Sequence, residues 1–250
     1  MRVNARQIDI RGEDVVSGFE SNLAARTFNS GNAGSLTIET DRLLVRDGGQ
    51  VSVSTFRQGN GGTLTVNATQ SVIASGDTGL NRSGLFARVN SNGTGRGGDL
   101  IINTPTLTIQ AGAAVSSAVF GTGQGGNVTV NAGQSIQVVG AGPRFVSSLT
   151  AFADNTGNAG NVTLTTRQLQ VQNGGEISTG TFSSAQGGRL TIQATDSVEV
   201  SGVSPDANQY PSTIFVDTSG TGNAGSLRLD TGRLSILNGG QVSAGTSGAG

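Results

Sequence analysis

The sequence predicts an all-β protein, a parallel β-helix of about seven to eight rungs with three short strands in each rung. Two observations lead to this fold class. Apolar residues alternate with polar ones over short runs, and the runs recur along the chain at two regular spacings. The first apolar residue of each repeat is Leu36, Leu64, Leu100, Val128, Val162, Leu190 or Leu227. The spacings are 28, 36, 28, 34, 28 and 37 residues, so short and long rungs alternate.

Three strands are expected within each rung. In residues 31–56, Leu36 and Ile38 fall on one side of the first run, and Val51 and Val53 on one side of the third. Alternation with a period of two is typical of strands, and Gly, Asn and Asp separate the runs as turn residues do. A β-propeller was the alternative repeat fold, but its blades need about 40–50 residues. The 28-residue rungs are too short for such a blade.

The repeats align into columns that predict the packing. Two columns of Leu, Ile and Val are expected to point inward, and a third column of alternating Thr and Ala is expected at a corner. The amides of Asn67, Asn103 and Asn131 are expected to form a ladder along three rungs. One Phe closes nearly every rung, and these rings are expected to stack as part of the packing. They are Phe28, Phe56, Phe86, Phe120, Phe152, Phe182 and Phe215.

The long rungs owe their length to insertions after the second strand, at residues 77–84, 141–148 and 203–211, with 11–21 as a fourth counterpart. Because they recur on every second rung, we expect them to project from one side of the rod. Loops on a rigid scaffold are frequent binding sites. Arg82, Arg144, Phe145 and Tyr210 lie in these insertions and form the predicted loop binding surface.

Composition excludes several classes of function. The chain has 250 residues with 41 Gly and 12% charged residues, and a net charge of −1 makes a nucleic-acid partner unexpected. It has no Cys and no His, which excludes a Cys or His nucleophile system and makes a zinc site unexpected. No apolar run approaches the ~18–20 residues of a membrane helix, so no membrane insertion is expected.

The spacing of the acidic residues supports neither a calcium site nor a catalytic site. Residues 95–103 resemble a calcium-binding Gly-rich repeat, but the Asp99 column does not repeat the Asp and the period differs. The acidic residues, Glu176 among them, fall in different columns. We therefore expect no acidic cluster with basic residues along one groove, no catalytic residues, no cofactor and no metal.

The strings at 31–58, 59–76 and 157–182 resemble the C-terminal repeats of filamentous-haemagglutinin-like exoproteins of the two-partner secretion type, particularly cyanobacterial members labelled S-layer family. The resemblance covers residues 31–250 well and 1–30 loosely. It implies a right-handed β-helix, export through an outer-membrane β-barrel transporter, and a secreted or cell-surface location associated with the outer membrane. The family's N-terminal secretion domain is not in this sequence.

Residues 1–250 are therefore expected to form a single β-helix array, open at both ends, within a longer protein. The predicted function is a structural and adhesive β-helix segment without catalysis, with cell-surface glycans or other cells as possible partners. Two alternatives stay open. One is a carbohydrate-active β-helix similar to a polysaccharide lyase or hydrolase, and the other is a passive spacer that displays a distal domain.

Overall fold

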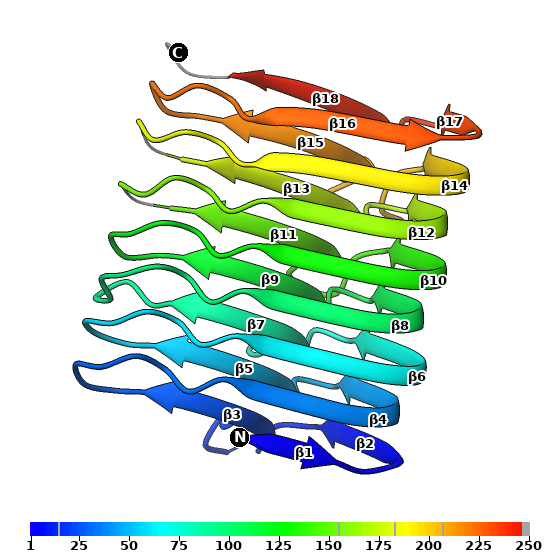
Figure 1. Cartoon of the computed structure of the whole chain (residues 1–250). Helices are drawn as coiled ribbons and strands as arrows, with labels where there is room; N and C mark the ends of the chain where they lie inside the picture. Colours follow the sequence, from blue (N-terminus) through cyan, green and yellow to red (C-terminus); the bar gives the residue numbers. More distant parts are fainter. Residues whose placement is uncertain (15, 155, 183, 207, 247–250) are drawn as a thin grey trace.

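The computed structural model describes residues 1–14, 16–154, 156–182, 184–206 and 208–246. These residues form strands and turns without a helix, so none of them belongs to a helix that could span a membrane. The strands stack as successive rungs from the N-terminal to the C-terminal end (Figure 1). The predicted parallel β-helix is confirmed.

Two parallel sheets run the length of the stack. Sheet 1 contains β1 (Arg2–Asn4), β2 (Gln7–Arg11), β4 (Leu36–Arg46), β6 (Leu64–Ser75), β8 (Leu100–Gln110), β10 (Val128–Val139), β12 (Val162–Gln172), β14 (Arg189–Ser201), β16 (Ser226–Thr231) and β17 (Leu234–Leu237). Sheet 2 contains β3 (Asn22–Thr27), β5 (Gln50–Thr55), β7 (Gly84–Val89), β9 (Ala114–Val119), β11 (Ser148–Ala153), β13 (Glu176–Thr181), β15 (Thr213–Thr218) and β18 (Gln241–Thr246).

The first two predicted strands of each central rung are fused into one long strand with a bend. The register shifts at the bend, for example between Thr40 and Arg42 where β4 pairs with β6. The Thr40 hydroxyl donates to the Arg42 carbonyl at 3.0 Å, and the Thr104 hydroxyl donates to the Thr106 carbonyl at 3.1 Å. Small residues that satisfy the freed carbonyl allow the strand to turn the corner without breaking. In the first and last rungs the same run is divided, into β1 and β2 and into β16 and β17.

The predicted inward columns form the core. Leu36 pairs with Leu64, and Leu64 with Leu100, so equivalent side chains lie directly above one another. The core positions of the central rungs are fully buried, and they alternate with half-exposed residues along each long strand. Burial of a Leu, Ile or Val side chain contributes about 1.5–3 kcal/mol. The stacked apolar columns are therefore the main favourable term in the fold.

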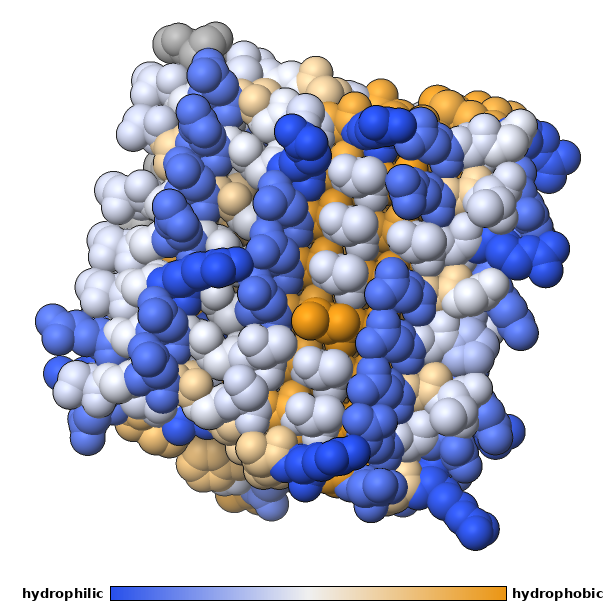
Figure 2. All heavy atoms as spheres, viewed as in Figure 1, coloured by the Kyte–Doolittle hydropathy of each residue, from blue (hydrophilic) through white to orange (hydrophobic). Residues whose placement is uncertain are grey.

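Polar ladders line the outside of the long strands. The predicted amide ladder is confirmed, because Asn103 Nδ2 donates to Asn67 Oδ1 at 2.7 Å and Asn131 Nδ2 donates to Asn103 Oδ1 at 2.9 Å. The Asp99 column forms a second ladder, in which Asp99 Oδ1 accepts from the Asn127 amide N–H at 2.9 Å. Figure 2 shows hydrophilic side chains aligned in columns along this face. Each column satisfies itself from rung to rung.

The turns between β4 and β5 and between the equivalent strands depend on left-handed backbone. Asp47 and Gly48 have φ angles of 54° and 89°, and Asn173 and Gly174 have 54° and 91°. Gly and Asn accept this conformation at low cost. The buried Ser83 hydroxyl then accepts from the Gly48 amide N–H at 2.9 Å, which ties the turn of a short rung to the next long rung.

We expect the substitution Ile102→Ala to lower the free energy of unfolding by about 2–5 kcal/mol, because it opens a cavity in a buried column. Urea denaturation of the whole chain measures this. Ile101→Ala is the matched control, since Ile101 is the adjacent residue in β8 and points outward. Equal losses for the two variants would contradict the assigned inward face.

Candidate functional site: a groove on the outer face of sheet 2

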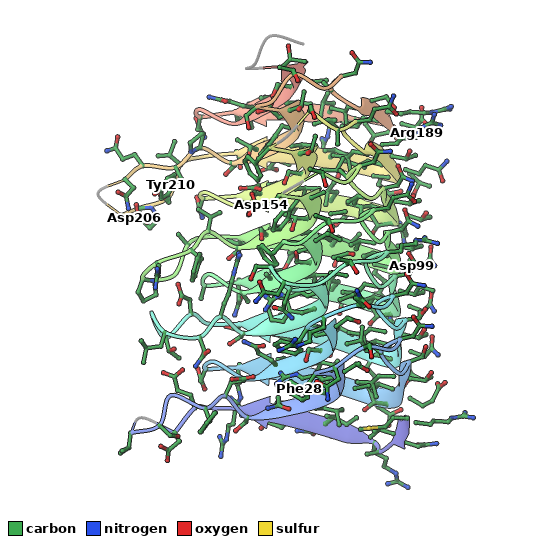
Figure 3. The ribbon with its side chains drawn as sticks, turned by 90° about the vertical axis from the view of Figure 1, so that its left-hand side faces the viewer. Phe28, Asp99, Asp154, Arg189, Asp206 and Tyr210 are labelled. Carbon is green, nitrogen blue, oxygen red and sulfur yellow. The ribbon has the colours of Figure 1, made fainter. Side chains whose placement is uncertain are left out.

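Four hairpins project beside sheet 2. They are the predicted insertions, and each joins a strand of sheet 1 to the next strand of sheet 2. Isolated antiparallel bridges close them at Glu13–Glu20, Asp77–Arg82, Ala141–Val146 and Val203–Pro211. In Figure 3 the hairpin that carries Asp206 and Tyr210 extends from one side, away from the edge where Asp99 and Arg189 lie. The expectation that the insertions share one side is confirmed.

Successive hairpins are hydrogen-bonded to one another across two rungs. Asn81 Nδ2 donates to Glu13 Oε2 at 2.6 Å and thereby joins the first hairpin to the second. Asp77 Oδ2 accepts from the backbone N–H groups of Arg144 and Phe145 at 2.8 and 2.9 Å, which joins the second to the third. The first three hairpins therefore form a continuous wall, and a small cavity separates the third hairpin from the fourth.

Arg82 strengthens this wall from within. Its guanidinium donates to the Gly112 carbonyl at 2.6 Å and to the Ser148 hydroxyl at 2.9 Å, and it also donates to the Val146 carbonyl. Burial lowers the pKa of Arg82 to about 10, although the charges of Glu176 and Asp77 oppose the shift. Because its donors are already engaged, Arg82 positions the third hairpin.

The predicted stacking of the seven Phe rings holds only in part, and the rings do not lie in the core. All seven lie on the outer face of sheet 2, because Leu85 and Ala87 point into the core and Phe86 therefore points away from it. The rings fall in three columns. Phe86 and Phe215 occupy the third strand position and Phe152 the fifth, while Phe28, Phe56, Phe120 and Phe182 follow the strand ends. Ring contacts are limited to Phe28–Phe56 at 4.7 Å, Phe120–Phe152 at 5.3 Å and Phe152–Phe182 at 6.4 Å among the described residues.

The outer face of sheet 2 and the hairpin wall enclose a groove of about 740 Å³. Its floor extends from Gln50 on β5 to Phe215 on β15, which is five rung steps or about 24 Å at ~4.8 Å per step. Within the strands, short rungs contribute small floor residues such as Ser116 and Gly180, and long rungs contribute the Phe residues. Phe120 and Phe182 follow the ends of short-rung strands. This alternation leaves a depression lined by aromatic rings and hydroxyl groups.

A smaller cavity of about 400 Å³ adjoins the groove between the third and fourth hairpins. Both spaces are lined by Phe145, Val146, Glu176 and Phe215. Together they form one composite site, which we call the sheet 2 groove.

The structure brings the four predicted loop residues together around this groove. Arg82 and Phe145 line the larger space, and Arg144, Phe145 and Tyr210 line the smaller one. The guanidinium carbons of Arg82 and Arg144 lie 5.1 and 5.5 Å from the centre of the Phe145 ring. The Tyr210 side chain is 45% exposed and open to a ligand.

Arg88 is a functional candidate that the sequence analysis missed. It lies on β7 with its guanidinium 3.5 Å from the centre of the Phe86 ring, and it lines the groove. Burial lowers its pKa to about 10. Its Nε atom is buried without a hydrogen-bond partner, and no ion pair joins Arg88 to any described residue.

Glu176 is a second candidate, at the point where the two spaces meet. Burial raises the pKa of its carboxyl group, while a hydrogen bond from the Ser178 hydroxyl at 2.7 Å and the charge of Arg82 oppose the shift. The larger space thus contains one buried acidic residue near Arg82. The strand columns separate Glu176 from Arg82 in sequence, and the hairpin brings them close.

Another depression, of about 770 Å³, follows the corner of sheet 1 beside Asn67 and Asn103. Several of its polar groups are already paired with one another. Asn67 Nδ2 donates to Glu39 Oε1 at 3.0 Å, and the Thr69 hydroxyl donates to Asp41 Oδ1 at 2.6 Å. Satisfied groups leave little for a ligand, so the sheet 2 groove is the stronger candidate.

No protein-family model matches the sequence, and comparisons with curated proteins and with solved structures give no match. Among the described residues, no group of three or more acidic side chains is placed to hold a metal ion.

We expect Asp77→Ala to lower the free energy of unfolding by about 1–3 kcal/mol, because the backbone N–H groups of Arg144 and Phe145 lose their acceptor. Hydrogen exchange of these two amides should accelerate. Asp154→Ala, at an exposed position, is the control and should change stability by less than about 0.5 kcal/mol. Unchanged hydrogen exchange at residues 144 and 145 would contradict the role of Asp77 in holding the third hairpin.

Glu176→Gln should change how stability depends on pH. Because the folded pKa of Glu176 is raised, its contribution is complete below the unfolded value of about 4.3 and is lost as pH rises through the folded value. The variant should therefore gain stability relative to the native chain over that window. Urea midpoints from about pH 4 to about pH 8 test this, and a constant difference would refute it.

Proposed function

We propose that this chain is an adhesive β-helix segment of a secreted or cell-surface exoprotein, and that it binds through the sheet 2 groove. The observation that carries the proposal is the continuous wall of hairpins beside an aromatic-lined depression. Aromatic and Arg side chains in partly enclosed pockets dominate binding energy at interfaces. On the outer face of sheet 1, by contrast, Asn and Asp columns bond to one another from rung to rung.

The cellular context rests on the resemblance of the repeats to filamentous-haemagglutinin-like exoproteins. Under that resemblance, an outer-membrane β-barrel transporter is the partner during export, and cell-surface glycans or other cells are the partners afterwards. The absence of Cys fits this route, because a chain that crosses a pore unfolded would be hindered by disulfides.

A carbohydrate-active β-helix is the second candidate, and Glu176 favours it because a buried carboxyl group with a raised pKa suits a general acid. Asp217 is the other acidic residue of the groove. It lies opposite Gly180, four positions along the strand from the level of Glu176, or about 13 Å at ~3.3 Å per residue. Two-carboxylate hydrolysis uses separations of about 5–9.5 Å, so binding without hydrolysis is the better-supported function.

The double substitution Phe145→Ala with Tyr210→Ala should reduce attachment to glycan-coated surfaces or cells at least about tenfold, since it removes aromatic contacts from both parts of the groove. Attachment of purified chain to such surfaces is the measurement. Phe19→Ala is the matched control, because Phe19 lies in the first hairpin, is 75% exposed and does not line the groove.

Replacing residues 77–82, 141–146 and 203–211 with short turns provides the stricter test. Attachment that persists both in the double-substituted chain and in the chain with replaced hairpins would favour a passive spacer and overturn the proposal. Release of reducing ends or unsaturated uronides from the bound polysaccharide would favour the carbohydrate-active alternative.

A further inference from the structure

Arg88 is a desolvated cation without a counter-ion among the described residues. Its guanidinium stacks on Phe86, and this cation–π contact offsets only part of the free energy needed to remove the charge from water. A buried charge is normally paired or hydrogen-bonded. An arginine that instead faces a ligand-sized groove is placed to receive an anionic group.

The other cations near this end of the groove are already engaged. Arg26 forms an ion pair with Glu20 at 3.0 Å and donates to the Ser52 hydroxyl at 3.0 Å. The guanidinium of Arg82 is hydrogen-bonded to carbonyls and to Ser148. The charges of Arg82 and Arg26 disfavour the cationic form of Arg88, and Glu20, which pairs with Arg26, favours it. Of the two arginines that line the larger space, Arg88 is therefore the one left to bind an anion.

The charge is uneven along the groove. Arg88 and Asp217 occupy the same strand column, with four rung steps between β7 and β15, or about 19 Å. Glu176 also lies nearer the Asp217 end, so both acidic residues that line the larger space are found toward β15. An anion is favoured beside Arg88, and a neutral group is favoured toward β15.

The surface between these ends combines rings and hydroxyl groups. Phe120 and Phe152 form one edge-to-face pair, and the hydroxyl groups of Ser116 and Thr150 lie on the floor, 3.0 Å apart. Aromatic faces pack against the C–H faces of sugars, and hydroxyl groups bond to sugar hydroxyls. The long axis of the groove crosses the strands, so it fits an extended chain and not a compact molecule.

We propose that the groove binds a linear glycan in which an acidic sugar is flanked by neutral sugars, with the acidic group on Arg88. This inference rests on the proposed function and adds the chemical class of the ligand. A carboxylate and a sulfate share the chemistry that Arg88 recognises, since a guanidinium donates paired hydrogen bonds to either.

The test measures binding of the whole chain to four defined oligosaccharides by calorimetry. Hyaluronan oligosaccharides carry one carboxylate per disaccharide, κ-carrageenan oligosaccharides carry one sulfate, agarose oligosaccharides are neutral, and polygalacturonate carries a charge on every unit. Binding of hyaluronan or κ-carrageenan, weakened by salt and stronger than binding of the other two, is expected. The preferred member of the pair identifies the acidic group.

Arg88→Gln should weaken binding of the preferred acidic oligosaccharide about 10- to 100-fold and flatten its salt dependence. Binding of the neutral oligosaccharide should not change. Arg167→Gln is the matched control, because Arg167 lies on sheet 1 and pairs with Asp196. Arg88→Lys should restore part of the affinity, since it restores the charge without the planar fork.

Equal affinity for acidic and neutral chains, or full affinity of Arg88→Gln for the acidic chain, would overturn this inference. If Arg88→Gln does not fold, the salt dependence and the acidic-to-neutral preference of the native chain decide. Attachment that depends on Phe145 and Tyr210 but shows no acidic preference would leave the proposed function standing and reject the ligand class. Attachment independent of Phe145 and Tyr210 would reject the proposed function itself.

Discussion

The parallel hydrogen-bond ladder is the constraint on which the rest of the structure depends. It fixes each residue directly above its equivalent in the previous rung, as Leu64 lies between Leu36 and Leu100. A side chain at a given position must therefore pack against the equivalent side chains of the neighbouring rungs. Leu and Val stack inside, Asn bonds to Asn outside, and Thr recurs at the bend. The low complexity of the sequence is a consequence of this geometry.

The alternation of long and short rungs creates the sheet 2 groove on an otherwise uniform scaffold. Each long rung adds a hairpin, and a buried Ser such as Ser83 or Ser147 ties its root to the turn of the preceding short rung. Short rungs contribute small residues to the face beside the hairpins. The wall therefore comes from the long rungs, whereas the floor of the sheet 2 groove combines residues of both rung types.

The fold could be predicted almost completely from the sequence, and the site only in part. Periodicity of two and a repeat of 28 residues specify stacked strands, and the insertions identify the loops that carry Phe145 and Tyr210. The sequence also specifies the face of sheet 2 on which the Phe rings lie. Phe56 lies an odd number of residues from Val51 and Val53, and this parity places it on the outer face. We instead grouped the Phe by their recurrence and overlooked their parity.

Arg88 and Glu176 could not be predicted in the same way. In sequence Glu176 is the one charged residue in a column of uncharged ones. The Arg88 column mixes Arg26 and Asp217 with uncharged residues, in no pattern that marks a site. Their burial arises because hairpins from other rungs fold over sheet 2, and the register of a strand does not specify where a hairpin lies. Arg82 is intermediate, since its place in an insertion indicated a role, but its bonds to Gly112 and Val146 depend on the folded hairpin.

The two-rung repeat also has a consequence for how such a site can change over generations. The interval from Leu36 to Leu100 is 64 residues, and it contains one short rung, one long rung and one hairpin. Duplication of a gene segment of this length would lengthen the sheet 2 groove by two rung steps, or about 10 Å, without altering the core. Duplication of a single rung would place two floors or two hairpins in succession and interrupt the wall. Recombination in whole pairs is thus a simple route to a longer or shorter binding surface.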